Sequence, residues 1–234
     1  MGATEKVSAM RAMFHAGLDE LMSELARMVR LAGQMMTNAS IALHQNDLAL
    51  ARLVIADRDR IKAMYDEMER RCVILLALQA PVAGDLRVVV AALRALGHVQ
   101  RMGDLARHVA VIAQIKRANP MTSGKVRPVL ARMSLLASQL AADAATAIEH
   151  QDPLSGCRLA IADDEVDALL RHLFGILFAA NWSHTVEQAV DAALVGRYYE
   201  RFGDHAVAIA RGVCYRVTGE LSEVNAVQGV SRLR

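Results

Sequence analysis

The stretch FHAGLDELMSELARMVRLAGQMMTNASIA (Phe14–Ala42) decides the fold of this chain. Its apolar residues recur at alternating spacings of four and three, and charged residues lie between them. A repeat of about 3.5 residues is typical of a long helix that buries one narrow face, here called a seam, against neighbouring helices. The positions of this seam are Phe14, Leu18, Leu21, Leu25, Met28, Ala32, Met35, Ala39 and Ala42.

Shorter seams continue along the chain. They comprise Ile61, Met64, Met68 and Leu75; Val129, Met133, Leu136, Leu140, Ala144 and Ile148; and Ala162, Val166, Leu169, Leu173, Ile176 and Ala180. The four prolines lie where the seams are interrupted. We therefore predict helices over 10–44, 47–78, 82–118, 126–150, 154–180 and 185–218. Residues 120–124 are predicted to form a central loop, and residues 1–9 and 221–234 to be frayed ends.

An internal repeat divides the chain into two similar halves. The segment Arg101-Met102-Gly103-Asp104 recurs one hundred residues later as Arg201-Phe202-Gly203-Asp204, and each copy is followed by an apolar helical run. Upstream, IAD at 55–57 recurs at 161–163. Each half then contains three helices. The sequence predicts an all-α fold of two tandem, pseudo-symmetric three-helix bundles, over 10–119 and 120–220.

The composition excludes several classes of protein. A chain that is 54% hydrophobic is not disordered, and a net charge of +2 does not suit a generic nucleic-acid or anionic-membrane binder. The longest charge-free stretches, Cys72–Gly84 and Leu173–Val186, are shorter than the ~20 residues of a membrane-spanning helix. The N-terminus lacks the pattern of a signal peptide. We therefore expect a cytoplasmic protein without membrane insertion, and read its three scattered cysteines as reduced.

Two pairs of acidic residues in the second half are each spaced by four: Asp163 with Asp167, and Glu200 with Asp204. Residues four apart lie on the same helix face. If the two helices pack side by side, the four carboxylates converge, and their repulsion favours a bound cation. We predict a site for a divalent metal or iron (Fe, Mn, Mg or Zn), whose identity the carboxylates do not determine. The alternative is an ordinary solvated helix face.

The first half departs from this acidic pattern. The repeat places Arg58, Lys62 and Gln100 where the second half has Asp163, Asp167 and Glu200, so that Asp104 is the one carboxylate left. Two cations and an amide do not form a carboxylate metal site. We expect Arg58 and Lys62 to form ion pairs with Asp104 instead, which leaves the first bundle without a metal.

No motif for catalysis stands out. The chain has no GxSxG, P-loop, GxGxxG or HExxH segment, and no dedicated general base is visible, so no catalytic residue is assigned. The histidines, among them His98 and His205, are interpreted as hydrogen-bonded or exposed side chains. A stripe formed by Arg87, Arg94 and Arg101, spaced by seven, lies on one helix face and is a candidate partner-binding surface, with a solvated face as the alternative.

Four segments carry a resemblance to a known family. The chain resembles the PhoU family of bacterial phosphate-transport accessory and regulatory proteins, over nearly its whole length from Met10. The matching segments are PVAGDLR at 81–87 (family pattern PxAxDLR), QRMGD at 100–104 and ERFGD at 200–204 (ERxGD), and DDEVDAL at 163–169 (DDxxxDxL).

The resemblance implies both a fold and a role. It implies two three-helix bundles, iron or other metals held by E(D)xxxD pairs, and no enzymatic activity. It also implies negative regulation of the phosphate-starvation response. The implied partners are the ATPase subunit of the phosphate ABC transporter and the PAS domain of a sensor histidine kinase. A homodimer is compatible with the sequence. The competing interpretations are a metal-dependent phosphohydrolase and a metal-free helical scaffold.

Overall fold

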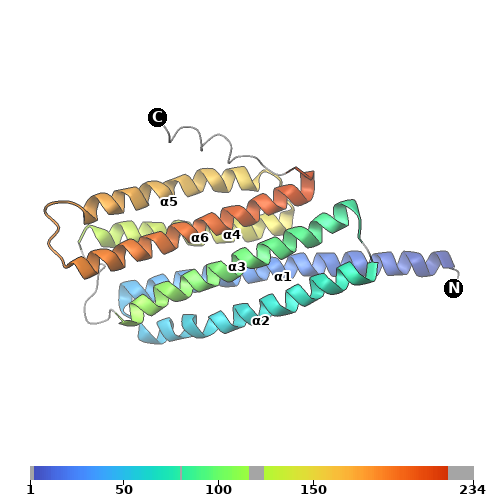
Figure 1. The fold of residues 1–234 in the computed structure, drawn as a ribbon, viewed down its shortest axis with the longest axis horizontal. Coiled ribbons are helices and arrows are strands. Elements are labelled where there is room, and N and C mark those ends of the chain that lie inside the picture. Colours follow the sequence, from blue (N-terminus) through green and yellow to red (C-terminus); the bar gives the residue numbers. More distant parts are fainter. Residues whose placement is uncertain (1–2, 80, 116–123, 221–234) are drawn as a thin grey trace.

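The structure is a computed structural model that describes residues 3–79, 81–115 and 124–220 (Figure 1). These residues form six helices and no strand, which confirms the all-α prediction. The helices are α1 (Ala3–Gln45), α2 (Leu48–Gln79), α3 (Ala83–Ile115), α4 (Val126–His150), α5 (Ser155–Leu177) and α6 (Val186–Thr218).

Two helix ends differ from the sequence-based boundaries. Helix α1 begins at Ala3, so residues 3–9, which were expected to be frayed, continue the helix. Helix α5 ends at Leu177, three residues early, because the chain tightens into a turn in which Ala179 donates its N–H to the carbonyl of Ile176. Most of the expected central loop (120–123) and the expected C-terminal tail (221–234) lie outside the described residues.

Residues with left-handed backbone conformations and a capping box shape several of the helix ends. Asn46 and Gln151 adopt left-handed backbone conformations (φ 57° and 52°) just after α1 and α4, and Gly219 does so after α6 (φ 79°). Thr185 and Gln188 form a reciprocal capping box at the start of α6. These residues satisfy backbone groups at the helix ends, and so define where each helix stops.

The six helices form two bundles that lie side by side. Helices α1, α2 and α3 pack on one another, as do α4, α5 and α6. Figure 1 shows the first three in the lower half of the view and the last three in the upper half. The bundles meet where α1 packs on α4 and α3 packs on α6, so equivalent helices of the two repeats face each other. This arrangement confirms the tandem bundles and joins them along two helix pairs.

The buried residues form one hydrophobic core that spans both bundles. All nine seam residues of α1 are buried, in agreement with the pattern from Phe14 to Ala42. Tyr199 is completely buried where the bundles meet, and its hydroxyl lies 2.8 Å from the hydroxyl of Ser40 on α1. A side chain from the second bundle is thereby tied into the first.

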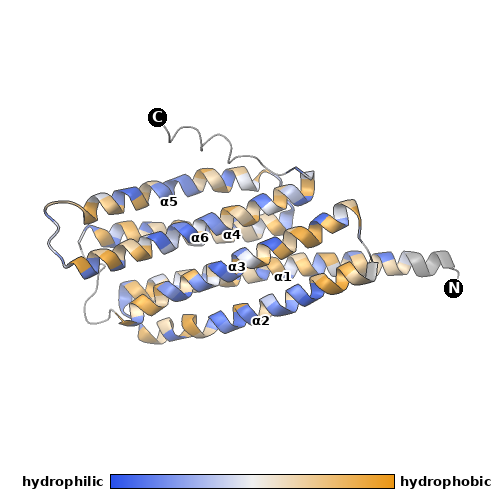
Figure 2. Cartoon of the chain, viewed as in Figure 1, coloured by the Kyte–Doolittle hydropathy of each residue, from blue (hydrophilic) through white to orange (hydrophobic). Residues whose placement is uncertain are grey.

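Exposed apolar residues gather at the two ends of the molecule. Figure 2 shows orange segments where α2 leads into α3 and where α5 leads into α6. Val73 and Val82 are exposed at the first of these ends, and Phe178 and Val186 at the second. None of the described helices is both long enough and apolar enough to cross a membrane.

The buried face of α5 differs from the predicted one. Ala162 and Ala180, expected in its seam, are exposed. The buried hydrophobic residues of α5 are Leu159, Val166, Leu170, Leu173 and Leu177, and Asp163 lies between the first two in the same four-three alternation. Asp163 therefore belongs to the seam, whereas the sequence placed it just outside the core. The predicted buried face of α5 is wrong because an acidic residue, Asp163, occupies one of its inward positions, and hydrophobic periodicity does not detect such a position.

Candidate functional site

Asp163 is held at the contact between α5 and α6. Its neighbour across the contact is Gly203, the glycine of the second RxGD segment, where an added Cβ would lie only 2.4 Å from Oδ1 of Asp163. Any other residue at position 203 would force the aspartate to move. The repeated glycine thus makes room for a carboxylate inside a helix–helix contact.

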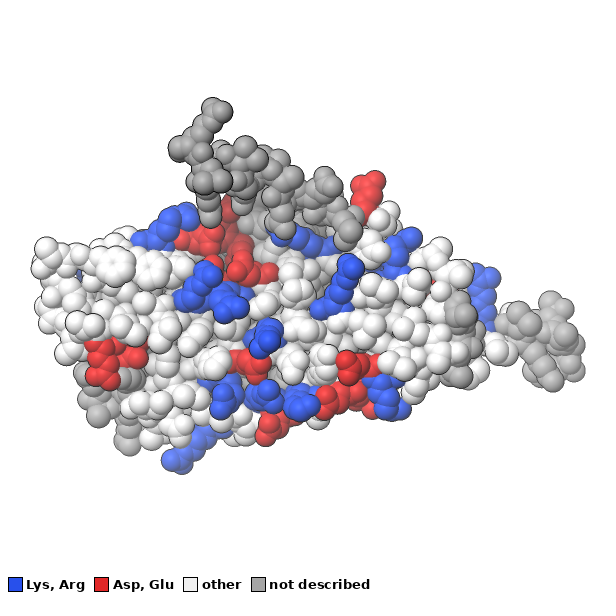
Figure 3. All heavy atoms as spheres, viewed as in Figure 1, with Lys and Arg blue, Asp and Glu red and all other residues white. Residues whose placement is uncertain are grey.

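The other three predicted acidic residues lie near Asp163. Asp167 follows it by one turn on α5, and Glu200 and Asp204 lie on α6. Figure 3 shows acidic side chains gathered over these two helices. Glu200 is buried, with 7% of its surface exposed, while Asp204 is open to solvent at its edge. We call these four residues the acidic cluster.

Burial and mutual repulsion raise the pKa of three members of the acidic cluster. The pKa of Asp163 rises to about 7, first through burial and then through the charges of Asp204, Asp167 and Glu200. The pKa of Glu200 also rises to about 7, chiefly through burial and Asp204, with Arg197 acting in the opposite direction. The pKa of Asp204 is raised by burial and by Asp167. The four carboxylates are thus close enough to interact strongly.

Two oxygens of the cluster lack hydrogen-bond partners among the residues that the structure describes. Oδ1 of Asp163 and Oε2 of Glu200 are buried and unpartnered, whereas Oε1 of Glu200 accepts a hydrogen bond from Arg197. A buried carboxylate oxygen without a partner is costly, and a proton or a cation would relieve that cost.

The chemistry of the acidic cluster fits a hard cation, because all of its ligating atoms are carboxylate oxygens. Across the described parts of the chain, however, no three His, Cys, Asp or Glu side chains are already arranged to hold a metal ion. The cluster therefore brings suitable donors into one region without a preformed coordination sphere.

The equivalent position in the first bundle carries an ion pair. Arg58 occupies the seam of α2 between Val54 and Ile61, as Asp163 does in α5, and its Nε lies 3.1 Å from Oδ1 of Asp104. The predicted contact between Arg58 and Asp104 is present. The prediction that Lys62 also forms an ion pair with Asp104 is wrong.

Lys62 pairs with a residue of its own helix. Its Nζ lies 2.9 Å from Oδ2 of Asp66, because residues four apart on an exposed helix face meet more easily than residues on two helices. Gln100, the counterpart of Glu200, is half-buried on α3. Asp104, the one carboxylate left at the equivalent positions, is thus neutralised by Arg58, with Arg101 of its own helix 3.9 Å from its Oδ2.

The arginine stripe of α3 lies partly against α6. Nε of Arg87 lies 3.5 Å from the carbonyl oxygen of Arg216, near the end of α6. The guanidinium of Arg94 lies over the ring of Tyr215, 5.7 Å from its centroid. Arg101 is exposed. Two of the three arginines therefore help to join the bundles, and Arg101 is the member most open to a partner.

A histidine pair joins the two bundles, which reasoning on each histidine separately had missed. Nδ1 of His98 on α3 lies 3.1 Å from Nδ1 of His205 on α6. Burial lowers the pKa of both rings, that of His205 to about 4 with a further contribution from His98. The signal in the sequence is that both residues lie within six positions of an RxGD glycine, at the level where α3 and α6 meet.

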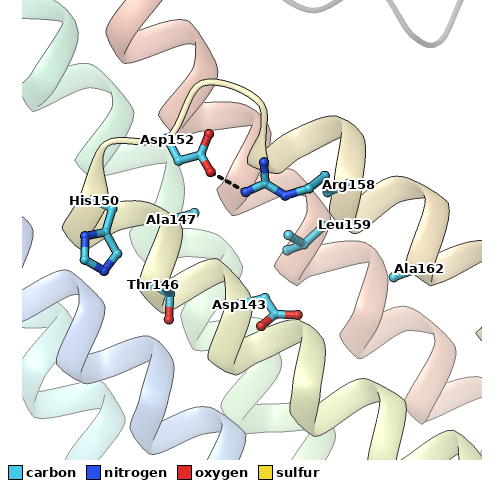
Figure 4. Close-up of a pocket in the computed structure, with 8 residues that line it drawn as sticks. All are labelled: Asp143, Thr146, Ala147, His150, Asp152, Arg158, Leu159 and Ala162. Atoms are coloured by element: carbon cyan, nitrogen blue, oxygen red, sulfur yellow. Dashed lines mark hydrogen bonds and ion pairs between the residues drawn. The ribbon is translucent and has the colours of Figure 1, made fainter.

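A cavity of about 300 Å³ lies between α4 and α5 (Figure 4). Asp152 and Arg158 face each other across its rim and form an ion pair. Asp143, on another wall, accepts a hydrogen bond from Gln139. These three charged groups already have partners within the chain, and His150 is the remaining titratable side chain of the lining.

Comparison with known proteins places these features in a family. The family described as PhoU domain matches residues 25–113 and 130–213, one match for each bundle. The chain is 41% identical over 220 residues to the phosphate-specific transport system accessory protein PhoU homolog 1 of Mycobacterium leprae, covering 94% of this chain and 99% of that protein. It is 42% identical over 210 residues to PhoU homolog 2 of Mycobacterium tuberculosis, covering 90% and 99%.

A solved structure agrees with both the fold and the sequence matches. The crystal structure of PhoU from Pseudomonas aeruginosa superposes with a TM-score of 0.80 at 26% identity, and covers 88% of this chain and all of that one. The two domain matches coincide with the two halves defined by the RxGD repeat. On this evidence, the chain belongs to the PhoU family.

Proposed function

We propose that this protein is a cytoplasmic negative regulator of the phosphate-starvation response. In this role it couples the phosphate ABC transporter, through the ATPase subunit, to a sensor histidine kinase, through its PAS domain. The relatives are named accessory proteins of the phosphate-specific transport system, which describes a non-enzymatic protein and supports a role beside the transporter. The observation that carries the finer proposal is the acidic cluster, with its two unpartnered oxygens, in one bundle only.

In the proposed mechanism, a metal ion neutralises the acidic cluster and thereby changes how tightly α5 packs on α6. Asp163, Asp167, Glu200 and Asp204 would hold the metal, which would supply positive charge to a region where two buried oxygens lack partners. Relief of that repulsion would tighten the contact between α5 and α6. The exposed helical faces, Arg101 among them, would then contact the partner proteins. In the first bundle, Arg58 provides the same neutralisation permanently.

Metal content tests the assignment of the acidic cluster. The purified wild-type protein is expected to retain a divalent metal or iron after gel filtration, and a Glu200→Ala, Asp204→Ala variant is expected to lose most of it, because half of the donors are gone. Elemental analysis by mass spectrometry provides the measurement. Asp104→Ala, in the first bundle, is the control and should leave the content unchanged. Full metal content in the double variant would contradict the assignment.

The two competing functions predict different results in cheap assays. A metal-dependent phosphohydrolase needs an open coordination position and a general base, and a panel of phosphoesters would reveal its activity. A metal-free scaffold would contain no metal by elemental analysis. The comparisons favour neither, because the relatives are named for an accessory role.

A co-purification experiment tests the coupling directly. Tagged protein, incubated with solubilised membranes of its own organism, is expected to retain both the transporter ATPase and the sensor kinase, as identified by mass spectrometry. Glu200→Ala is expected to retain several-fold less of at least one of them, because its acidic cluster is incomplete. Arg52→Leu, an exposed change on α2, is the matched control. Retention of neither protein by the wild type would exclude the proposed coupling.

A further inference from the structure

We propose that a cavity between α3 and α6 binds a small tetrahedral oxyanion of the size of inorganic phosphate. The polar residues of its lining are Arg94 and His98 from α3, and Arg211 and Tyr215 from α6. None of the lining residues belongs to the acidic cluster, and the inference does not rest on the proposed regulatory role.

The size and lining of the cavity suit a small anion. Its volume is about 180 Å³, which is small for a drug-sized ligand. Ala91, Ala95, Ala208 and Gly212 line the rest of it, together with Ile209. Small side chains on both helices leave the space open, and the two guanidinium groups provide planar sets of N–H donors that match the oxygens of phosphate.

Both arginines are available to a ligand. Among the described residues, neither Arg94 nor Arg211 forms an ion pair with a carboxylate. Arg211 does lower the pKa of Asp204, a member of the acidic cluster, although the two side chains do not form an ion pair. An anion in the cavity would accept charge-assisted hydrogen bonds from these guanidinium groups, which no carboxylate of the described residues occupies in an ion pair.

The cavity residues are also held in place by the surrounding structure. Arg94 is exposed at the mouth of the cavity, where its guanidinium lies over the ring of Tyr215. The backbone of Arg211 is fixed by close contact with α5, since a Cβ on Gly156 would lie 3.2 Å from the Cα of Arg211. Nδ1 of His98 is engaged with His205, which leaves Nε2 as the remaining polar atom of the ring. Groups held before binding lose less entropy when a ligand arrives.

The internal repeat provides a comparison within the same molecule. A shift of one hundred residues, taken from the two RxGD segments, carries these four positions onto the other half of the contact between α3 and α6. There the chain has Leu194, Tyr198, Val111 and Ile115 in place of Arg94, His98, Arg211 and Tyr215. The same pair of helices therefore packs without cations at the equivalent place. The fold does not require the two arginines, and their presence on one side points to a ligand.

An anion in this cavity would connect the two bundles, because Arg94 belongs to the first and Arg211 to the second. The contact between α3 and α6 would gain charge-assisted hydrogen bonds from both sides. A bound anion would thereby stabilise the native arrangement of the bundles in proportion to its occupancy.

Isothermal titration calorimetry with inorganic phosphate tests the proposal. The full-length protein, treated with a chelator so that phosphate cannot bind through a metal, is expected to bind one phosphate per chain. Arg94→Leu and Arg211→Val each copy the residue that the repeat has at the equivalent position, and each is expected to weaken binding at least about tenfold. Arg94→Lys, which keeps the charge but loses the planar donor set, is expected to be intermediate. Arg52→Leu, which removes an exposed charge on a helix that does not pack on α6, should bind like the wild type.

Specific outcomes would overturn the inference. The first is the absence of any heat of binding with the wild type. The second is wild-type affinity in folded Arg94→Leu and Arg211→Val variants. The third is a loss of affinity in Arg52→Leu as large as in those two variants, which would indicate general attraction to a basic surface. Far-UV circular dichroism shows whether each variant is folded. Phenyl phosphate distinguishes a free anion from a phosphoryl group on another molecule: the small cavity predicts tighter binding of inorganic phosphate, and the reverse preference would contradict a site for the free anion. None of these results bears on the co-purification experiment.

Discussion

Deletion of the gene is expected to make the phosphate-starvation genes constitutive, so that cells in ample phosphate express them at the level that the parent strain reaches in starvation. The reason is that a negative regulator which couples the transporter to the kinase is needed to pass on the signal of sufficiency. A reporter fused to a phosphate-starvation promoter, measured at high and low phosphate in a strain without paralogues, provides the test.

Complementation then connects this effect to the structure. The wild-type gene and the Arg52→Leu allele are expected to restore repression at high phosphate. A Glu200→Gln, Asp204→Asn allele removes two charges of the acidic cluster with little change in shape, and is expected to restore little of it. Normal repression in the deletion strain would contradict the regulatory role itself. Normal repression by the double-variant allele would instead contradict only the part assigned to the acidic cluster.

The fold could be predicted from the sequence because its signals are repeated along the chain. The seam from Phe14 to Ala42 recurs at two positions in each successive heptad of a long helix, and all nine of its residues are buried. The two RxGD segments then define two equivalent halves, which the structure shows packed against each other. A pattern carried by many residues tolerates a few exceptions, and this is why helix number and bundle order were predictable.

The acidic cluster could be predicted only in part, because its details depend on single residues. The spacing by four placed Asp163 and Asp167 together, but it did not show that Asp163 replaces an apolar residue in the seam. That position follows from Gly203, which admits a carboxylate where a larger residue would not fit. Lys62 could pair with either Asp66 or Asp104, and spacing in the sequence does not decide between them; the structure shows the pair with Asp66.

The side-chain contacts between the two bundles could not be predicted from hydrophobic periodicity. The pair of His98 with His205, and the cavity beside it, arise where α3 crosses α6. The pattern within one helix identifies a buried face, but it does not identify which residue of another helix lies opposite. The repeat could have supplied this information, because it makes α3 and α6 equivalent helices, and equivalent helices face each other where the bundles meet.

The Asp163→Asn variant of the metal-free protein is expected to become more stable than the wild type as the pH rises. The native pKa of Asp163 is about 7, against an ordinary value of 3.8. Between these values the native protein keeps a proton that the unfolded chain has released, so the wild type is favoured at low pH and loses that contribution as the pH passes 7. The amide carries no charge at any of these pH values. After a discount for solvent screening, the advantage of the variant should be about 2 kcal/mol larger at pH 8 than at pH 5.

Urea denaturation of both proteins at several pH values, in the presence of a chelator, measures this difference. A comparison with the wild type is needed because the lowered pKa of His205 gives an opposite contribution, with stability gained as the pH rises from about 4 toward the ordinary value of 6.5. That contribution is present in both proteins and cancels. Asp104→Asn is the control: it breaks the ion pair with Arg58, and should lower the stability without growing more favourable at high pH.

Addition of a divalent metal should reverse the order of the two proteins. A cation binds the ionised carboxylates, so its stabilisation of the wild type grows with pH, while Asp163→Asn lacks one of the donors. The same residue then destabilises the metal-free protein and stabilises the metal-bound one. A stability difference that does not change with pH would show that Asp163 is not held in a buried, repulsive site. A metal that stabilises both proteins equally would show that Asp163 is not among its ligands.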